Sequence, residues 1–166
     1  MKRIAGFDSK FFVIFLFFAF VNNGCQYGNR FAGTSSAKLE GVSVDMIDMQ
    51  KEFTYSAGEG IFFDESSYVI RPEDIHILSS IGSWLESHDC DFVIAGHTDG
   101  QGTRNYNMVL GFHRARMVYN YLLARGIPSS RMKTTSYGKE LPISLGLSEN
   151  SYAKNRRAVV ILKRCR

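Results

Sequence analysis

The feature that most constrains the fold is a strand-like apolar run, a long helical pattern and a second strand-like run in direct succession. Phe92–Ala95 is apolar and of strand length, and a glycine stops it. Arg104–Arg125 follows with helical periodicity and ends at Gly126, a residue type that commonly terminates helices. Met132–Tyr137 then predicts another strand. This order favours an α/β fold in which strands and helices form separate layers.

Similar patterns flank this unit on both sides. Ile61–Asp64 predicts the end of a first strand, and Pro72 opens another helix with acidic residues in its first turn. That helix is expected to end near His88. Lys139–Ser151 predicts a loop, and Arg157–Lys163 predicts a buried final strand.

The helix over Arg104–Arg125 has an apolar stripe that predicts its core face. The stripe consists of Met108, Val109, Phe112, Ala115, Val118, Tyr119 and Leu122. Asn107, Leu110 and Arg114 project roughly 100° away from it. We therefore expect these three side chains to form a shallow ligand-binding rim outside the core. On that reading, replacing Arg114 changes the free energy of unfolding by less than about 1 kcal/mol.

The N-terminal residues have the pattern of an export signal. Lys2, Arg3 and Lys10 supply positive charge, and Phe11–Val21 is a nearly pure apolar run. A membrane-spanning helix needs about 20 apolar residues, so this run is too short to cross a bilayer. We expect residues 1–24 to be a signal peptide.

Cys25 directly follows this segment, in the position where bacterial lipoproteins carry a lipid-modified cysteine. Asn22 stands where such signals usually have an aliphatic residue, so the alternative is ordinary cleavage that leaves Cys25 as a free or paired thiol. Residues 25–60 are rich in glycine, serine and threonine and predict a lipid-anchored flexible tether ahead of a domain over 61–166. Alternatively, a strand or helix forms around Val42–Phe53.

Composition and charge argue against nucleic-acid binding and catalysis. The formal net charge is +4, which falls to about +2 without residues 1–24, and the basic residues form no stripe. The histidines belong to no metal-binding or nucleophile motif, and we interpret His97 as a packing or hydrogen-bonding residue at a strand end. We therefore predict a protein that is not an enzyme and uses no cofactor and no metal.

Short motifs in the C-terminal part of the chain carry a family resemblance. They are Gly96-His97-Thr98-Asp99, Tyr106-Asn107, Leu110-Gly111, Arg114-Ala115, Ser136–Glu140, Pro142 and Tyr152–Val159. In this order they resemble the OmpA-like peptidoglycan-binding domain family, and within it the peptidoglycan-associated lipoproteins (Pal). The resemblance implies a mixed four-stranded sheet with helices mainly on one face and an antiparallel last strand.

The resemblance also implies a ligand, the meso-diaminopimelate of peptidoglycan stem peptides, which carries an ammonium and a carboxylate on one carbon. Asp99 would bind the ammonium, and the fork of Arg114 would bind the carboxylate in two parallel hydrogen bonds. Asn107 would orient the ligand, and Leu110 would pack against its aliphatic stem.

Two more residues are candidate contacts of this ligand. Asp64 follows the first predicted strand, and Arg156 begins the last one, near the same end of the sheet if that strand is antiparallel. Because side chains alternate along a strand, Arg156 and Arg157 cannot both face the site, and we favour Arg156.

By the same resemblance, the chain would be anchored to the periplasmic face of the outer membrane, tether it to peptidoglycan, and meet the Tol-system proteins TolB and TolA. The alternatives are a motor stator of the MotB kind or another OmpA-like envelope protein, and a wall hydrolase with an attached binding module. Phe11–Val21 is too short for the membrane helix of a stator, and a separate catalytic domain does not fit into the chain.

Cys90 and Cys165 are candidates for a disulfide, which an exported location permits. Cys90 begins the second predicted strand and Cys165 ends the last one. Antiparallel pairing would bring the two cysteines together and would set His97 opposite Ala158. The alternative is two separate thiols.

Overall fold

The computed structural model of the protein describes residues 44–166. Its helices and strands are α1 (Val44–Ala57), β1 (Ile61–Phe62), α2 (Ile75–Ser87), β2 (Cys90–His97), α3 (Arg104–Ala124), β3 (Met132–Gly138), α4 (Glu149–Asn155) and β4 (Arg157–Cys165), with 3₁₀ turns at Pro72–Asp74 and Ser129–Arg131. Within this part, no helix is long and apolar enough to span a membrane. The expected signal peptide and Cys25 lie outside the described residues.

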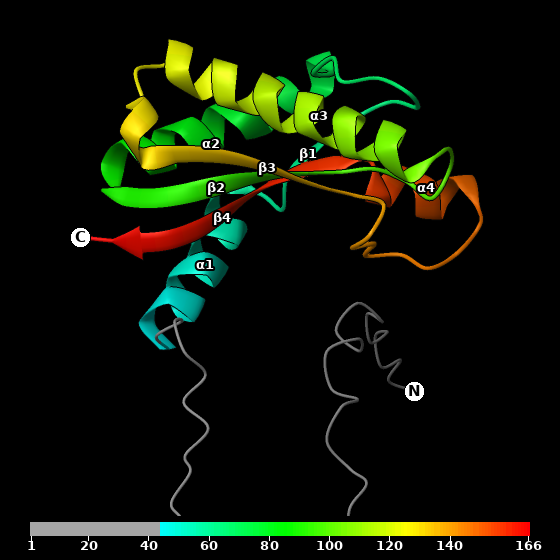
Figure 1. Ribbon diagram of the computed structural model, residues 1–166. Coiled ribbons are helices and arrows are strands. Elements are labelled where there is room, and N and C mark those ends of the chain that lie inside the picture. Colours follow the sequence, from blue (N-terminus) through cyan, green and yellow to red (C-terminus); the bar gives the residue numbers. More distant parts are fainter. Residues whose placement is uncertain (1–43) are drawn as a thin grey trace, which may run out of the picture. The chain divides into compact units, whose positions relative to one another are not determined.

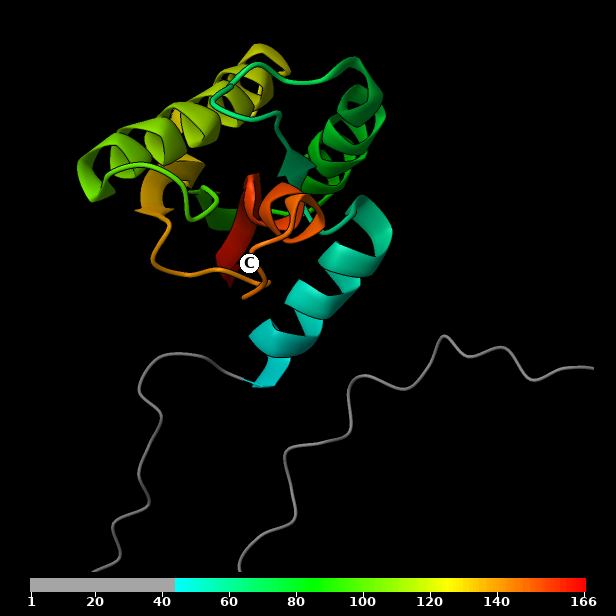
Figure 2. The ribbon, with the colours of Figure 1, turned by 90° about the vertical axis from the view of Figure 1, so that its right-hand side faces the viewer.

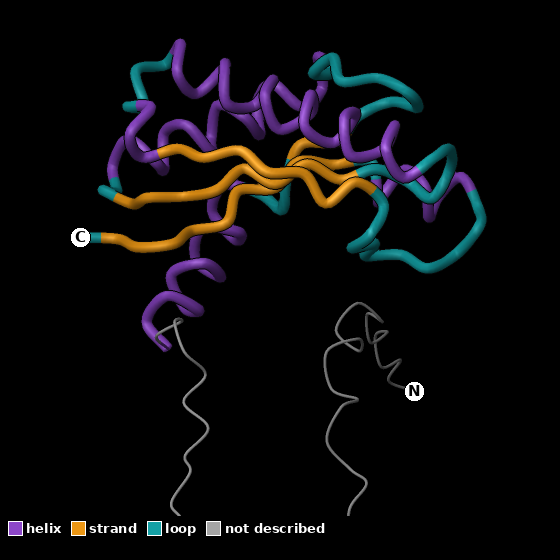
Figure 3. The backbone as a smooth tube through the Cα atoms, viewed as in Figure 1, coloured by secondary structure: helices purple, strands orange, loops and turns teal. Residues whose placement is uncertain are grey.

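The strands form a four-stranded sheet in the order β1-β4-β2-β3 (Figures 1 and 3). β4 is antiparallel to both β1 and β2, whereas β2 and β3 are parallel. α2 and α3 cover one face of the sheet, and α1 lies along the outer edge of β4, where it also contacts α2 (Figure 1). The expected mixed sheet with helices mainly on one face is therefore confirmed.

The core lies between the sheet and the covering helices. Phe92 and Ile94 of β2 meet Leu78, Ile81 and Leu85 of α2 in one apolar cluster, and each of these side chains is at most 1% exposed. Burying a side chain of this size stabilises the fold by roughly 1.5–3 kcal/mol. The apolar periodicity of α2 is thus a correct guide to the face that it buries.

α1 begins the folded part earlier than the sequence predicts. Phe53 and Ala57 are 2% and 3% exposed. The Phe53 ring also meets Trp84 edge-on, with ring centroids 4.9 Å apart. The prediction of a flexible tether over 25–60 is therefore wrong for residues 44–57. The alternative of an ordered segment around Val42–Phe53 is closer to the structure, because α1 depends on burial against α2 and β4.

Gln50 of α1 pairs with the outer edge of β4. Its side-chain amide donates to the carbonyl of Val160 at 3.2 Å and accepts from the N–H of Leu162 at 2.8 Å. The backbone of one residue on a neighbouring parallel strand would make such a pair of bonds, to a carbonyl and to the N–H two residues further along. β1 pairs with β4 only at Ala158 and Arg157. Gln50 therefore occupies the edge of β4 where β1 stops.

Cys90 and Cys165 form a disulfide in the structure, with their Cα atoms 3.9 Å apart. They are also paired residues of β2 and β4. The pairing slips by one residue near the start of β2, where the ladder is irregular. Ala158 consequently faces Gly96 rather than His97, so the predicted register is wrong at the far end of these strands.

The segment between β3 and β4 contains a helix that the sequence did not predict. Lys139–Ser151 is predicted as a loop, but α4 begins at Glu149 and is seven residues long. The Ser148 hydroxyl caps it by accepting from the N–H of Ser151 at 3.3 Å. A helix of two turns is too short to show a reliable apolar period, which explains why the sequence prediction failed here.

α3 touches β2 backbone to backbone where Gly111 meets Gly96. A Cβ atom on Gly96 would overlap the carbonyl oxygen of Gly111, and a Cβ atom on Gly111 would overlap the Ser136 hydroxyl of β3. Two residues without side chains therefore let the helix lie directly on the carboxyl ends of β2 and β3.

We predict that Gly96→Ala lowers the free energy of unfolding by about 2 kcal/mol or more, because α3 must move away from β2. Gly100→Ala is the matched control, since a Cβ atom there meets no atom within 4 Å. Urea unfolding of both variants measures the difference. Equal stability of the two would show that the close approach is not a constraint on the fold.

Candidate functional site

The carboxyl end of β2 opens into a small pocket bordered by the loop after β1, the loop after β2 and the first turns of α3. Its volume is about 250 Å³. Figure 2 views the domain from the side on which α4 lies. The pocket is lined by Glu65, Ser66, Asp99, Gln101, Gly102, Tyr106, Asn107 and Leu110.

Asp99 places a carboxylate in this pocket, although the residue is only 7% exposed. One of its oxygens, Oδ1, accepts from the N–H of Gln101 at 3.1 Å. The other, Oδ2, lies 3.4 Å from the guanidinium of Arg156. A carboxylate has about four lone-pair positions, so the two contacts leave acceptor capacity for a ligand.

Arg114 is fully buried and makes three hydrogen bonds to backbone carbonyls. It donates to Ser67 at 2.8 Å, His97 at 2.9 Å and Asp64 at 3.0 Å, and its guanidinium lies over the Phe63 ring at 5.3 Å. Burial lowers the pKa of Arg114 to about 10, which leaves it charged at neutral pH; the negative charge of Asp99 acts in the opposite direction.

The structure corrects the predicted orientation of α3. Asn107, Leu110 and Arg114 belong to its buried face, whereas Val109 and Phe112 of the predicted stripe are 57% and 44% exposed. The reason is the close approach of α3 to β2, which turns the face containing Gly111 toward the sheet. The expectation that Arg114 stands outside the core is therefore wrong.

Asn107 and Leu110 line the pocket, but Asp64 does not. The Asn107 amide donates to the carbonyl of Gln101 and so holds the loop after β2. Leu110, 7% exposed, supplies an apolar wall. The side chain of Asp64 is exposed, and the contact that links this residue to the site is its backbone carbonyl, which accepts from Arg114.

Arg156 lies behind Asp99 and contacts Glu149 of α4 as well. Burial opposes its charge, but the hydrogen bonds to Glu149 and Asp99 outweigh this effect and raise the pKa of Arg156. Arg157 instead donates to the carbonyls of Asn155 and Leu141, both at 3.4 Å. Of the two neighbouring arginines, Arg156 is thus the one in contact with Asp99.

His97 sits beneath the site at the end of β2 and is 4% exposed. Burial and the nearby charge of Arg157 together lower the pKa of His97 to about 4, although a backbone hydrogen bond with Leu141 acts in the opposite direction. Its Nδ1 atom has no hydrogen-bond partner among residues 44–166. The imidazole is therefore neutral at pH 7 and lies 5.4 Å from the Tyr137 ring, between centroids.

Sequence reasoning missed the part of the pocket wall contributed by the loop after β1. Glu65 and Ser66 line the pocket, and Ser66 has a φ of 52°, the only left-handed residue other than glycine among residues 44–166. Such a backbone is uncommon outside glycine and often occurs near functional sites. Ser66 and Ser67 are residues that turns favour, but nothing in their sequence indicates that the turn borders the same pocket as Asp99.

Comparison with known proteins assigns the chain to a family. Residues 62–156 match the profile of the OmpA family. The chain belongs to the OmpA family. It is 33% identical to the peptidoglycan-associated lipoprotein of Brucella melitensis over 163 residues, which cover 98% of this chain and 97% of the relative. It is 41% identical to the protein of the same name from Rhizobium meliloti over 140 residues, covering 84% and 80%.

Solved structures agree with this assignment. The crystal structure of the peptidoglycan-associated lipoprotein from Burkholderia pseudomallei matches with a TM-score of 0.60 and 35% identity, covering 64% of this chain and 91% of that one. The C-terminal domain of Helicobacter pylori MotB matches with the same TM-score, 0.60, at 20% identity, covering 64% and 84%, and shows the shared fold alone. The OmpA family is a non-enzymatic binding family, in agreement with the prediction that the chain is not an enzyme.

For this OmpA-family domain we predict that Arg114→Ala lowers the free energy of unfolding by about 3 kcal/mol or more, because it empties a fully buried side-chain position and removes the donor of one buried and two partly buried carbonyls. Arg116→Ala, an exposed site on the same helix, is the control and should cost less than about 1 kcal/mol. Urea unfolding at neutral pH compares them. Similar losses would show that the buried guanidinium does not hold the loops together.

His97 makes a second prediction possible, on pH. In the unfolded chain His97 is protonated near its ordinary pKa of 6.5, whereas in the folded chain its pKa is about 4. Stability should therefore fall by up to about 3 kcal/mol as the pH drops through this window. His97→Gln should remove that part of the pH dependence of urea unfolding. Parallel curves for the two proteins would contradict the assignment.

Proposed function

We propose that the chain binds peptidoglycan non-covalently through the diaminopimelate of its stem peptides. The observation that carries this proposal is a buried carboxylate, Asp99, that faces a small pocket while two guanidinium groups lie behind it. A ligand carbon with both an ammonium and a carboxylate matches this pairing of charges.

Each pocket residue has a chemical role in the proposal. Asp99 accepts from the ligand ammonium, and Glu65 is a second carboxylate residue that lines the pocket. Leu110 and Tyr106 contact the aliphatic stem. The carboxylate of the ligand lies toward the positive charges of Arg114 and Arg156. Because Arg114 is buried beneath the loops, it acts through its charge and by positioning the loops, and less by direct bidentate hydrogen bonding to the ligand.

The size of the pocket supports an amino-acid ligand. Pockets for drug-sized molecules have volumes of roughly 300–1,000 Å³, whereas this one has about 250 Å³. This volume suits the end of one long side chain better than a whole disaccharide. Among wall components, the free end of diaminopimelate has both the size and the charges required.

We predict that Asp99→Asn weakens binding to diaminopimelate-containing peptidoglycan by about 2 kcal/mol or more, because it removes the partner of the ammonium and leaves the shape unchanged. Co-sedimentation with purified peptidoglycan measures this. Asp91→Asn, at the opposite end of β2, should bind like the unmodified chain. Peptidoglycan with lysine in place of diaminopimelate lacks the carboxylate and should bind weakly to all three proteins.

Retention of full binding by Asp99→Asn would show that the pocket is not the binding site. Equal binding of lysine-type peptidoglycan would show that the carboxylate is not recognised. Urea unfolding of each variant checks that a loss of binding is not a loss of fold.

We further propose that the chain is a lipoprotein on the periplasmic face of the outer membrane, working with TolB and TolA. Its similarity to lipoproteins over nearly their whole length supports this proposal. A motor-stator role has weaker support, since the MotB likeness shows only the fold. Cross-linking in intact envelopes should join the chain to TolB; cross-links to motor proteins alone would favour the stator.

The anchor has its own prediction. Mass spectrometry of the native protein should find an acylated Cys25 as the N-terminal residue. Cys25→Ser should then leave the detergent phase and appear in the aqueous phase. A mature N-terminus at another residue would contradict the lipid anchor and leave the wall-binding proposal unaffected.

A further inference from the structure

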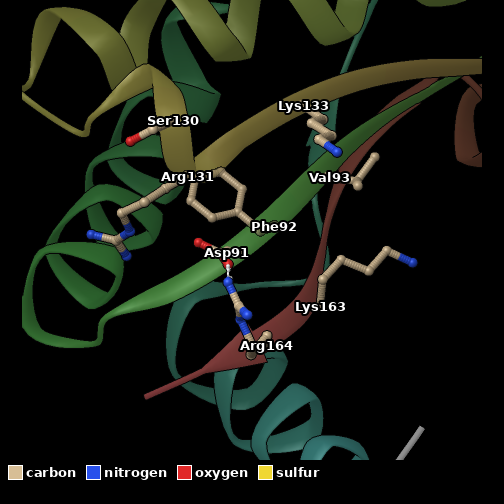
Figure 4. Close-up of a pocket in the computed structure, with 8 residues that line it drawn as sticks. All are labelled: Asp91, Phe92, Val93, Ser130, Arg131, Lys133, Lys163 and Arg164. Atoms are coloured by element: carbon tan, nitrogen blue, oxygen red, sulfur yellow. Dashed lines mark hydrogen bonds and ion pairs between the residues drawn. The ribbon is translucent and has the colours of Figure 1, made fainter. Parts of the chain in front are cut away.

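The sheet face turned away from α2 and α3 has a basic hollow at the end opposite to the pocket of Asp99. The hollow has a volume of about 480 Å³ and crosses β2, β3 and β4 (Figure 4). We call the surface that lines this hollow the basic sheet face. It is lined by Asp91, Phe92, Val93, Ser130, Arg131, Lys133, Lys163 and Arg164.

The charge of the basic sheet face is positive and available to a ligand. Lys133 and Lys163 are exposed on neighbouring parts of the sheet, and among the residues drawn in Figure 4 the marked ion pair joins Asp91 to Arg164 and not to either lysine. The one acid of the hollow, Asp91, is paired with Arg164 at 2.7 Å and Arg166 at 3.1 Å. Its acceptor capacity is already used, so it does not neutralise the two lysines.

An apolar surface adjoins Lys163. Met46 and Ile47 of α1 form a groove with Ile161 and Lys163 of β4, and Ile47 is 47% exposed. Aliphatic side chains bordered by lysines are typical of surfaces that lie in the interface of a membrane with anionic lipids.

The place where the N-terminal segment joins the domain indicates which partner this surface contacts. α1 begins at Val44, so the segment that leads back to Cys25 joins the domain beside the basic sheet face. The pocket of Asp99 lies at the other end of β2, roughly 25 Å away for a strand of this length. One end of the domain can therefore contact a membrane while the other contacts a ligand beyond it.

We propose that the basic sheet face docks on anionic phospholipid, with Lys133 and Lys163 contacting headgroup phosphates and Ile47 entering the interface. This rests on the proposed membrane anchoring in one respect: the lipid on Cys25 would bring the face to the membrane. The docking then holds the domain with the Asp99 pocket pointing away from the bilayer.

The test uses residues 25–166 with Cys25→Ser, which keeps every described residue and removes the lipid. Co-sedimentation with vesicles of phosphatidylglycerol and phosphatidylcholine should exceed that with phosphatidylcholine alone, and added salt should abolish the difference. The double variant Lys133→Glu, Lys163→Glu should bind the anionic vesicles at least about tenfold more weakly. Ile47→Ser should weaken binding by a smaller factor.

The control Arg116→Glu, Lys154→Glu changes net charge equally at exposed positions of α3 and α4, and it should keep most of the vesicle binding. An equal loss of vesicle binding in both double variants would overturn the proposal, and so would the lack of any preference for anionic vesicles. Loss of peptidoglycan binding in Lys133→Glu, Lys163→Glu with unchanged vesicle binding would also overturn it and assign the face to a wall polymer. Asp99→Asn should keep vesicle binding, so failure of the wall proposal and failure of this one are distinguishable.

Discussion

The backbone contact between Gly96 and Gly111 is the constraint on which the site depends. It allows α3 to rest on the carboxyl ends of β2 and β3 without intervening side chains. Only at that distance can Arg114 reach the carbonyl of His97 on β2, and only then does Asn107 meet the loop that carries Asp99. The pocket therefore forms because α3 lies so close to β2 and β3.

Arg114 uses the short distance between α3 and β2 to hold the neighbouring loops in one arrangement. Its three donors bind carbonyls from the loop after β1 and from the end of β2, segments separated by some thirty positions along the sequence. A buried arginine is expensive to desolvate, and its hydrogen bonds offset that cost only if every carbonyl stays in place. The positive charge under Asp99 and the shape of the pocket wall are therefore maintained by the same side chain.

The sequence was sufficient to predict the strands, α2, the sheet end that carries Asp99 and the pairing of Cys90 with Cys165 as a candidate disulfide. The sequence led to a wrong prediction of the buried face of α3. The count of apolar residues assumes that the core face is apolar, whereas Asn107, Gly111 and Arg114 occupy that face here. The sequence indicated a helix in the region of α1 only as an alternative to a strand or a tether, because that helix depends on tertiary contacts. It missed α4, a short helix with a single cap, and the slipped register of β4, which no pattern of apolar residues records.

Gln50 has a consequence beyond the attachment of α1. The free edge of a strand can pair with the edge of another molecule, and natural proteins cover or interrupt such edges. Here a single side-chain amide occupies the donor and acceptor that β4 would otherwise present at Val160 and Leu162. Because that amide belongs to α1, the helix that joins the domain to the rest of the chain also protects it from aggregation through β4.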